Sequence, residues 1–396
     1  MNYFHMNISM IKRTICIVIH NRANYARIKS VMIAIKKREN LKLQVILGSS
    51  SILSRFGNVR KIIESDGFEI DAIVYSAIEG ENPTTMAKST GLSIIELATH
   101  FENLKPDIVL TVADRYETLS TAVAASYMNI PLAHTQGGEV TGSIDENVRH
   151  AITKLSNIHF PATKRAYEFL IKLGEDPKTV FLTGCPSIDL LNNIDLDLKK
   201  NFFKSYRGVG SILSEKQKYI LVLQHPVTTE YQNSFFQINE TLKAIKVLSE
   251  KIQIAWLWPN IDAGSDNISK GLRIFRENND SKNICFFKNF SPEDYARLLK
   301  NSSCIVGNSS SGLREGAFLG VPCVNIGTRQ RNRERSSNVI DVDYNSASIM
   351  NAIKIQLTKN KYKKNILFGD GNAGEKIAEI LHNVKPNISK QLNYLN

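Results

Sequence analysis

Short apolar runs alternate with longer amphipathic segments along the first half of the chain. Runs rich in β-branched residues predict buried strands near 14–19, 41–47, 70–75, 108–112, 130–133, 159–163 and 180–184. Between them, segments with helical periodicity predict helices near 26–37, 51–65, 90–103 and 118–128. Because strand and helix alternate with short connections, this half is typical of a doubly wound parallel sheet.

The same alternation restarts after a polar segment, residues 192–217, which we interpret as an interdomain linker. Strands are predicted at 219–223, 252–257, 304–306 and 323–326, with a helix over 234–250. The sequence therefore predicts an α/β protein of the GT-B type, with two Rossmann-like, doubly wound parallel-sheet domains that face a central cleft. We expect an N-terminal domain over 1–195, a C-terminal domain over 196–374, and a C-terminal helix in 375–396 that joins the first domain.

Composition narrows the class of protein. The formal net charge of +12 is spread over short clusters, and no basic tail, zinc-finger spacing or RNP-like aromatic motif points to nucleic acid. The five cysteines form no CxxC pair, which indicates a reducing cytosol without a disulfide framework or structural zinc. No apolar run is long enough to span a bilayer. We therefore expect a cytoplasmic enzyme with a small-molecule substrate.

Polar side chains follow two neighbouring predicted strands in the region 107–155, at the sheet edge where open α/β folds bind ligands. A capping-box pattern from Ser143 to Glu146 predicts that a helix begins there. Carboxylates that converge raise one another's pKa, which suits a general acid or base. A simple intrahelical ion pair between Asp145 and Arg149 is the structural alternative. The catalytic candidates of this region are Asp114, Gln136, Glu139 and Asp145, with Arg115 and Arg149 beside them.

A glycine- and serine-rich turn, GNSSSGLRE at 307–315, joins a predicted strand to a helix in the second half. Backbone N–H groups at such a turn, with hydroxyl groups beside them, can bind a diphosphate, although an ordinary N-cap serine explains the motif equally well. No Gly-Lys-Ser/Thr follows, so the turn is not a Walker A loop. The substrate-binding candidates here are Ser309, Ser310, Gly312, Glu315 for ribose hydroxyls, and Arg329 for the anion.

The first strand-to-helix turn contains Arg22, which could reach a phosphate across the cleft. This turn lacks GxGxxG, so binding of NAD or FAD is not expected. His225 follows a strand of the second domain and could face the acids of the first. The histidines are separated and form no HxxxH pair, so we predict no metal site.

Taken together, these motifs resemble the UDP-N-acetylglucosamine 2-epimerase family, and within it the hydrolysing branch that feeds sialic acid synthesis. The matching pieces are NRANY (21–25), ADRYE (113–117), GGEVTGSIDENVRHAITKL (137–155), QHPVTT (224–229), PNIDAGS (259–265), GNSSSGLREGAFLGVP (307–322), NIGTRQRNRE (325–334) and GDGNA (369–373). The resemblance implies a GT-B fold, no metal or nicotinamide cofactor, and a homodimer or homotetramer.

The resemblance also implies the chemistry. Such enzymes remove the C2 proton of the sugar, expel UDP by anti elimination to a 2-acetamidoglucal, and hydrate it to N-acetylmannosamine. Asp114 and Asp145 match catalytic acids of the family, and His225 matches a histidine near the diphosphate. The matches to nucleotide contacts are Arg22, Arg115, Ser309, Ser310, Glu315 and Arg329. Asn260 and Arg149 match residues near the sugar.

Three positions depart from the family pattern. Ala113 replaces the usual glycine before the Asp-Arg pair, Asn24 stands where relatives commonly have Asp or Glu, and Gln136 stands where many relatives have a glutamate thought to act as acid or base. Because glutamine exchanges no proton at neutral pH, either Glu139 or Asp145 takes that part, or the substrate differs. The alternatives are a UDP-2,4-diacetamido-2,4,6-trideoxyglucose substrate of the legionaminic acid route, a non-hydrolysing epimerase, a GT-B glycosyltransferase, and an inactive sugar-nucleotide-binding module.

Overall fold

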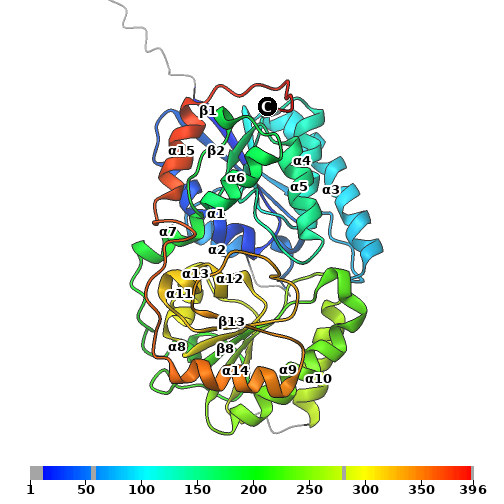
Figure 1. The fold of residues 1–396 in the computed structure, drawn as a ribbon. Coiled ribbons are helices and arrows are strands. Elements are labelled where there is room, and N and C mark those ends of the chain that lie inside the picture. Colours follow the sequence, from blue (N-terminus) through cyan, green and yellow to red (C-terminus); the bar gives the residue numbers. More distant parts are fainter. Residues whose placement is uncertain (1–11, 55–58, 279–281, 394–396) are drawn as a thin grey trace, which may run out of the picture.

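The computed structural model describes residues 12–54, 59–278 and 282–393. It contains two lobes, each built on a sheet with helices on both faces (Figure 1). The first lobe holds the strands β1 to β6, and the second holds β7 to β13. The predicted fold class, two parallel-sheet α/β units of the GT-B type, is confirmed.

The first sheet has six parallel strands in the order β3-β2-β1-β4-β5-β6. Its strands are nearly continuous apolar runs because helices cover both faces of the sheet. The strands are β1 (Arg13–Ile19), β2 (Leu41–Gly48), β3 (Ala72–Val74), β4 (Ile108–Val112), β5 (Leu132–Thr135) and β6 (Ile158–Phe160). The helices are α1 (Arg22–Lys36), α2 (Val59–Ser65), α3 (Pro83–Leu104), α4 (Tyr116–Tyr127), α5 (Asp145–Leu155) and α6 (Lys164–Lys172).

The second sheet has seven strands in the order β13-β12-β11-β8-β9-β10-β7, of which β7 alone runs antiparallel, against β10. The strands are β7 (Val209–Gly210), β8 (Tyr219–Leu223), β9 (Gln253–Leu257), β10 (Ile284–Phe287), β11 (Cys304–Gly307), β12 (Cys323–Ile326) and β13 (Val339–Val342). The helices are α8 (Phe202–Ser205), α9 (Ser234–Ser249), α10 (Ser265–Asn278), α11 (Pro292–Asn301), α12 (Ser310–Leu313), α13 (Glu315–Leu319) and α14 (Ser346–Thr358). Single turns of 3-10 helix, at Ser49–Ile52, Pro177–Thr179 and Thr228–Asn233, complete the elements.

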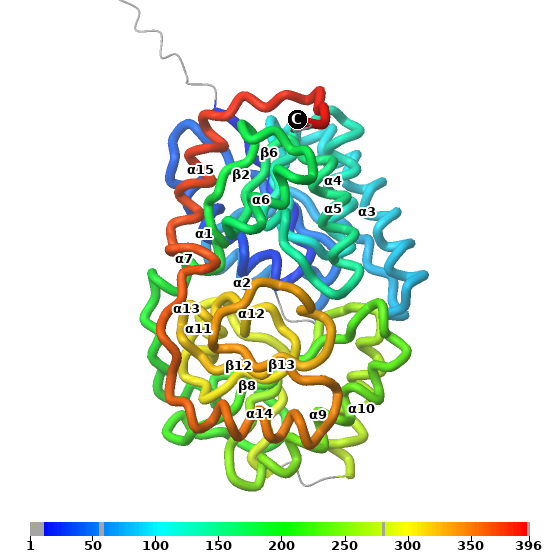
Figure 2. The backbone as a smooth tube through the Cα atoms, viewed as in Figure 1, coloured from blue at the N-terminus to red at the C-terminus, as the bar shows by residue number. Residues whose placement is uncertain are grey.

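Two segments connect the lobes. Helix α7 (Pro186–Asn193) packs both on α1 and on α13. After α14 the chain returns to the first lobe, where α15 (Ala373–Asn383) lies beside α1, as the red segment of Figure 2 shows. The side chain of Asp189 in α7 accepts hydrogen bonds from the backbone N–H groups of Ala373 and Gly374, at 2.9 and 2.6 Å. These bonds satisfy N–H groups in the first turn of α15 that have no partner within the helix.

The structure differs from the local predictions in two segments and contains strands that were not predicted. Residues 180–184 form no strand, because after an isolated bridge from Val180 to His159 the chain turns away through Gly184, whose φ is +89°. The capping box at the start of α5 forms only in part: the Ser143 hydroxyl accepts from the backbone N–H of Asp145, at 3.4 Å, but the Glu146 carboxylate accepts from the backbone N–H of Thr141, at 2.7 Å, and not from that of Ser143. The strands β7, β10 and β13 were not predicted.

The polar segment 192–217 is not a plain linker. It contains α8 and β7, and its Phe202 and Phe203 side chains are buried in the core of the second lobe. Part of the helix predicted near 51–65 lies outside the described residues, and its described end is α2. Within the described ranges, no helix combines the length and apolar character needed to cross a bilayer.

Candidate active site

The carboxyl ends of β4 and β5 place the first lobe's acids at the cleft. Strand β4 ends at Val112, and Ala113 then adopts a left-handed backbone with φ +63°. This conformation costs a residue with a Cβ about 1 kcal/mol, so a glycine would be favoured at this position. The turn aims Asp114 at Arg149 of α5, which forms an ion pair with it. A second arginine, Arg333, approaches Asp114 from the other lobe, with nitrogen and oxygen 3.5 Å apart.

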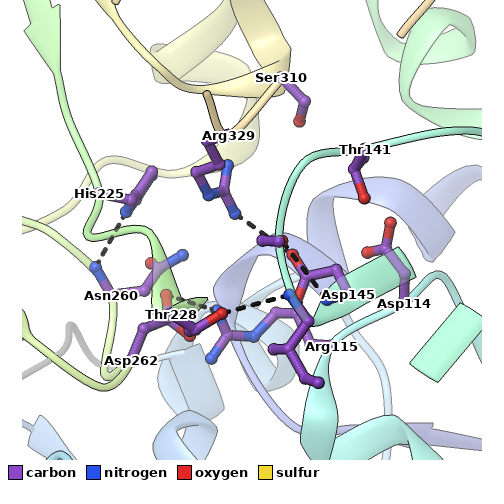
Figure 3. A network of polar contacts seen from close by, with 12 residues as sticks. Asp114, Arg115, Thr141, Asp145, His225, Thr228, Asn260, Asp262, Ser310 and Arg329 are labelled. Carbon is purple, nitrogen blue, oxygen red and sulfur yellow. Dashed lines mark hydrogen bonds and ion pairs between the residues drawn. The ribbon is translucent and has the colours of Figure 1, made fainter. Parts of the chain in front are cut away.

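Asp145 is the first residue of α5 and faces the second lobe. Its carboxylate lies 3.7 Å from Arg329 (Figure 3). The intrahelical pair between Asp145 and Arg149 that the spacing suggested does not form. Instead the buried Arg149 binds Asp114 and Glu146, the latter at 2.6 Å. Asp145 is therefore left with one long ion pair, whereas Asp114 has two partners.

These different surroundings separate the pKa values of the two acids. Burial would raise the pKa of Asp114, but the charges of Arg149 and Arg333 outweigh burial and hold the pKa far below its usual range. For Asp145, burial and the nearby negative charge of Asp114 raise the pKa to about 6, although Arg329 opposes the shift. Two carboxyl groups with divergent pKa values in one cleft are a pattern typical of acid–base catalysis.

The other two acid–base candidates of the sequence lie behind this cleft. Glu139 forms ion pairs with Arg314 and Arg333, the second at 3.2 Å. Burial raises the pKa of Glu139, but these arginines outweigh it and lower the pKa below its usual value. The Gln136 side chain, fully buried, accepts a hydrogen bond from Arg314. Neither residue lines the cavity that contains Asp114 and Asp145.

The second lobe contributes the serine turn after β11. The Ser309 hydroxyl accepts from the backbone N–H of Ser311, at 3.3 Å, and the Ser310 hydroxyl accepts from Arg27 of the first lobe, at 2.7 Å. Glu315 points one carboxylate oxygen, Oε2, into buried surroundings without a hydrogen-bond partner. A buried carboxylate oxygen in a cavity wall suits a ligand that carries hydroxyl groups.

Gly312 does not reach the cleft. It lines neither of the two cavities that lie at the interface of the lobes. A Cβ at this position would lie 2.6 Å from the sulfur of Cys323. The structure therefore gives Gly312 a packing role beneath the serine turn.

His225 and Asn260 lie at the carboxyl ends of β8 and β9. The backbone N–H of Asn260 donates to Nδ1 of His225, at 3.2 Å (Figure 3). Burial first, and then the positive charges of Arg329 and Arg22, lower the pKa of His225 well below its usual value. The imidazole is therefore neutral, and because Nδ1 accepts, the ring proton sits on Nε2. A neutral Nε2–H group can donate to an anion.

Two arginines of the first lobe reach across to the same region. Arg22 donates to the side-chain oxygen of Asn260, at 3.1 Å, and to the backbone oxygen of Trp258, at 2.8 Å. Arg115 forms an ion pair with Asp262 across the cleft, at 2.7 Å. Both therefore hold the two lobes together beside the acids.

Two adjoining cavities occupy the interface of the lobes and share Ala23, Arg27, His225, Asn260, Ser309 and Ser310. One cavity is polar and contains the acids; its other lining residues are Asp114, Arg115, Thr141, Asp145, Arg329, Gln330 and Arg333. The second contains Arg22 and Glu315 and has a largely apolar wall that includes Val59, Ile62, Leu191, Phe290 and Pro292. A molecule with a charged centre and two dissimilar ends fits this arrangement.

Comparison with known proteins gives the family. Residues 33–382 match the family described as UDP-N-acetylglucosamine 2-epimerase. A Legionella pneumophila protein named UDP-N,N'-diacetylbacillosamine 2-epimerase (hydrolyzing) is 33% identical over 384 residues, which cover 97% of this chain and 99% of the relative. The chain belongs to the UDP-N-acetylglucosamine 2-epimerase family. The predicted resemblance is confirmed, and the protein is a UDP-sugar 2-epimerase.

A further sequence relative and a solved structure are similar to this epimerase. A Campylobacter jejuni relative, named GDP/UDP-N,N'-diacetylbacillosamine 2-epimerase (hydrolyzing), is 33% identical over 85% of this chain and 86% of its own. A crystal structure of Methanocaldococcus jannaschii UDP-GlcNAc 2-epimerase in complex with UDP-GlcNAc and UDP covers 93% of this chain and 99% of its own, with a TM-score of 0.77 and 21% identity. At that identity, the structural match supports the fold alone.

Sequence reasoning missed two arginines of this epimerase's cleft. Arg27 lines both cavities and contacts Ser310, and Arg333 joins Asp114 to Glu139. A signal was available for Arg333, which lies within the matched motif 325–334, but not for Arg27, because a spacing of five residues from Arg22 does not place two side chains on one helix face. Among the residues that the structure describes, no group of three or more His, Cys, Asp or Glu side chains could hold a metal ion.

Proposed function

We propose that this epimerase is of the hydrolysing type and converts UDP-N-acetylglucosamine into N-acetylmannosamine and UDP. The observation that carries the proposal is the pair Asp114 and Asp145, which share one polar cavity but have opposite pKa shifts. The polar lining of that cavity suits a sugar with hydroxyl groups, since Ala23 is its one apolar side chain among the described residues. The second cavity, with Glu315 and an apolar wall, suits the nucleoside.

Asp145 is the group that takes the C2 proton in this proposal. A pKa of about 6 leaves its carboxylate mostly ionised at pH 7 yet basic enough to accept a proton. As the C2–H bond breaks, its electrons form the C1=C2 double bond, and the C1–O bond to UDP breaks. Asp114 stays ionised beside Arg149 and Arg333 throughout, so the local field does not change during turnover.

The departing UDP carries the negative charge that develops. Arg27 and the neutral His225 line both cavities, next to the hydroxyls of Ser309 and Ser310, and Arg329 lines the polar cavity. Fixed donors placed where charge develops lower the barrier without reorganising during the step. Water then supplies a hydroxyl group to C1 and a proton to C2 on the opposite face, which inverts C2 and releases the free sugar, and Asp145 gives the proton that it took to the solvent.

A second substrate is supported by the relatives. The Legionella and Campylobacter proteins are named for UDP-N,N'-diacetylbacillosamine, which is UDP-2,4-diacetamido-2,4,6-trideoxyglucose. The same acid–base steps at C1 and C2 would operate on that sugar, since it differs only at C4 and C6. Its acetyl and C6 methyl groups would have to fit in the polar cavity.

The test is proton NMR of the protein with each UDP-sugar in deuterium oxide. The proposal predicts free UDP and a reducing 2-epimer that carries deuterium at C2. A UDP-linked 2-epimer would show a non-hydrolysing enzyme instead. Binding without C2 exchange, measured with calorimetry on the same sample, would contradict the proposed reaction and indicate a transferase or an inactive binding module. The relative kcat/KM for the two sugars decides the substrate.

A further inference from the structure

A series of alternating charges, buried except at the partly exposed Glu146, lies behind the acids of the cleft. Arg314 pairs with Glu139; Arg333 pairs with Glu139 and Asp114; Arg149 pairs with Asp114 and Glu146. We call these six residues the buried ion-pair chain. Three arginines face three carboxylates, and Arg27 and Glu315, whose charges also act on Arg314, add one charge of each sign, so this group of charges is electrically balanced.

Gln136 ends this chain. Arg314 donates from Nη1 to the Gln136 side-chain oxygen, at 2.6 Å, and the Gln136 amide donates to the sulfur of Cys185, at 3.4 Å. Arg314 and Cys185 are the two titratable residues that form hydrogen bonds with the Gln136 side chain, and Arg314 also donates to Glu139. The Gln136 side chain is fully buried and turned away from both cleft cavities.

The backbone holds this orientation independently of the amide. Gln136 follows β5 with a left-handed φ of +63°, and its backbone N–H donates to the oxygen of Phe160, at 2.9 Å. A residue with a side chain is strained in this conformation. The strain at the end of β5 directs the side chain at Arg314, which arrives from the other lobe.

Charge decides which residue suits this position. A glutamine offers Arg314 an acceptor without adding charge. A glutamate would be a fourth carboxylate in a buried chain with three arginines, and it would compete with Glu139 for one guanidinium. Carboxylates that share one cation at close range cannot all ionise easily, so one of them retains a proton.

We propose that Gln136 is a neutral positioning residue: it orients Arg314 against Glu139 and, by carrying no charge, keeps the buried ion-pair chain balanced beside Asp114. The inference deepens the proposed epimerase reaction and rests on it for its kinetic test. It assigns the proton transfer at C2 to the cleft residue Asp145. It removes position 136 from the groups that exchange protons with the substrate.

Gln136→Glu tests this through the sign of a pH trend. At low pH the protonated glutamic acid resembles glutamine, so kcat should be close to the unaltered value. As the pH rises, the new carboxyl group ionises and unbalances the chain. The ratio of variant to unaltered kcat should therefore fall by about tenfold between pH 5.5 and 8.5, as expected when one interacting group titrates within that range. If position 136 exchanged protons with the substrate, the variant would be faster, and its advantage would grow with pH as a base ionised.

Two further variants, Gln136→Met and the control Gln44→Glu, separate the loss of the hydrogen bond from the change in charge. Gln136→Met removes the acceptor of Arg314 and should lower kcat by about tenfold while KM stays within about twofold. Gln44 is a buried glutamine of β2 whose amide donates to the backbone oxygen of Leu104, far from the cleft. Gln44→Glu makes the same chemical change without arginine neighbours, so its kcat should show no trend with pH relative to the unaltered protein.

Thermal unfolding of Gln136→Glu gives a second readout that needs no substrate. The folded-state pKa of the new carboxyl should be raised above its unfolded value, so the deficit in Tm should be small near pH 4 and widen as pH rises. A kcat ratio above one that grows with pH, a ratio independent of pH, or an unaffected Gln136→Met would each overturn the inference. If neither UDP-sugar is turned over by the unaltered protein, the proposed function fails, and a Tm deficit without pH dependence would still overturn the charge argument by itself.

Discussion

The two edges of the cleft differ in how their charges are held. On the first lobe, Asp114 and Arg149 are buried together, and their partners fix their protonation. On the second lobe, the polar groups are a serine turn, a neutral histidine and Arg329, whose one ion pair is 3.7 Å long. In the proposed reaction, the first edge supplies a constant field and the base, and the second supplies donors that can still bind an anion.

Within the first edge, the carboxyl groups of Asp114 and Asp145 differ in the same way, because their pKa values are held by different partners. Both are acidic residues at the start of a turn or helix, yet two arginines hold one ionised, whereas the other keeps a pKa near neutrality. This difference in pKa follows from the arginine partners rather than from the residue type.

Asp145→Asn should have the largest effect. An amide cannot take the C2 proton, and loss of a positioned general base typically lowers the rate by about 10²–10⁴-fold. We expect kcat to fall by about 10³-fold with nucleotide binding retained, measured by UDP release and calorimetry. Asp176→Asn, an exposed aspartate outside the cleft, is the matched control. An Asp145→Asn variant with near-normal kcat would remove Asp145 from the reaction.

Arg329→Met should come next. It removes a cation that faces both the diphosphate region and Asp145, and we expect kcat/KM to fall by about 10²-fold, as is typical for one lost electrostatic donor. Since Arg329 opposes the rise in the pKa of Asp145, its loss should also move the acid limb of the pH–rate profile to higher pH. A loss of activity with an unmoved acid limb would show that Arg329 does not act on Asp145.

The unaltered protein should itself lose activity in acid. The pKa of Asp145 is raised to about 6, so the fraction of ionised base, and with it kcat/KM, should fall by about tenfold for each pH unit below that value. Initial rates between pH 5 and 8 measure this limb. An acid limb near pH 4 would mean that the base has an ordinary carboxyl pKa.

Glu315→Gln should mainly weaken nucleotide binding. Its unpartnered carboxylate oxygen belongs to the cavity that we assign to the nucleoside, away from the reacting carbon atoms. An interaction made equally in the ground state and transition state raises KM without lowering kcat, so we expect KM to rise by about tenfold. Glu102→Gln, an exposed glutamate on α3, should leave KM unchanged. A selective drop in kcat would place Glu315 at the chemistry instead.

Arg60→Ala should have the smallest effect of all. Arg60 and Glu64 form an i,i+4 ion pair on α2 with both side chains about half exposed. Solvent screens such pairs strongly, in contrast to the buried ion-pair chain. We expect no measurable change in Tm or kcat by thermal denaturation and initial rates. A clear loss of either would show that surface charge matters more than the contrast between the edges implies.

The sequence predicted the first-lobe strands best where an apolar run is long and flanked by polar residues, as in β1, β2 and β4. It failed at 180–184, because apolar character cannot reveal that the backbone turns away at Gly184. Strand β10 was missed although its residues, ICFF, are apolar and fully paired with β9. Here the apolar run was present in the sequence, but it is only four residues long.

The sequence predicted which residues form the site but not which of them form ion pairs. Asp114, Asp145, His225 and Arg329 were found from their positions after strands or at a helix start, and the structure brings them to one cavity. The spacing of Asp145 and Arg149 suggested a helical ion pair, but tertiary contacts direct Arg149 to Asp114. Pairing across the lobes, as for Arg333 and Arg314, depends on how two sheets approach each other, and no local pattern contains that information.

The central claim is that neighbouring carboxyl groups of one cleft have opposite protonation behaviour. Carbon NMR of the protein with labelled aspartate carboxyl carbons, assigned with Asp114→Asn and Asp145→Asn, measures both groups directly between pH 4 and 8. The account predicts that Asp145 titrates near pH 6 and that Asp114 stays ionised across the whole range. Titration of Asp145 near pH 4, or protonation of Asp114 within the range, would contradict it.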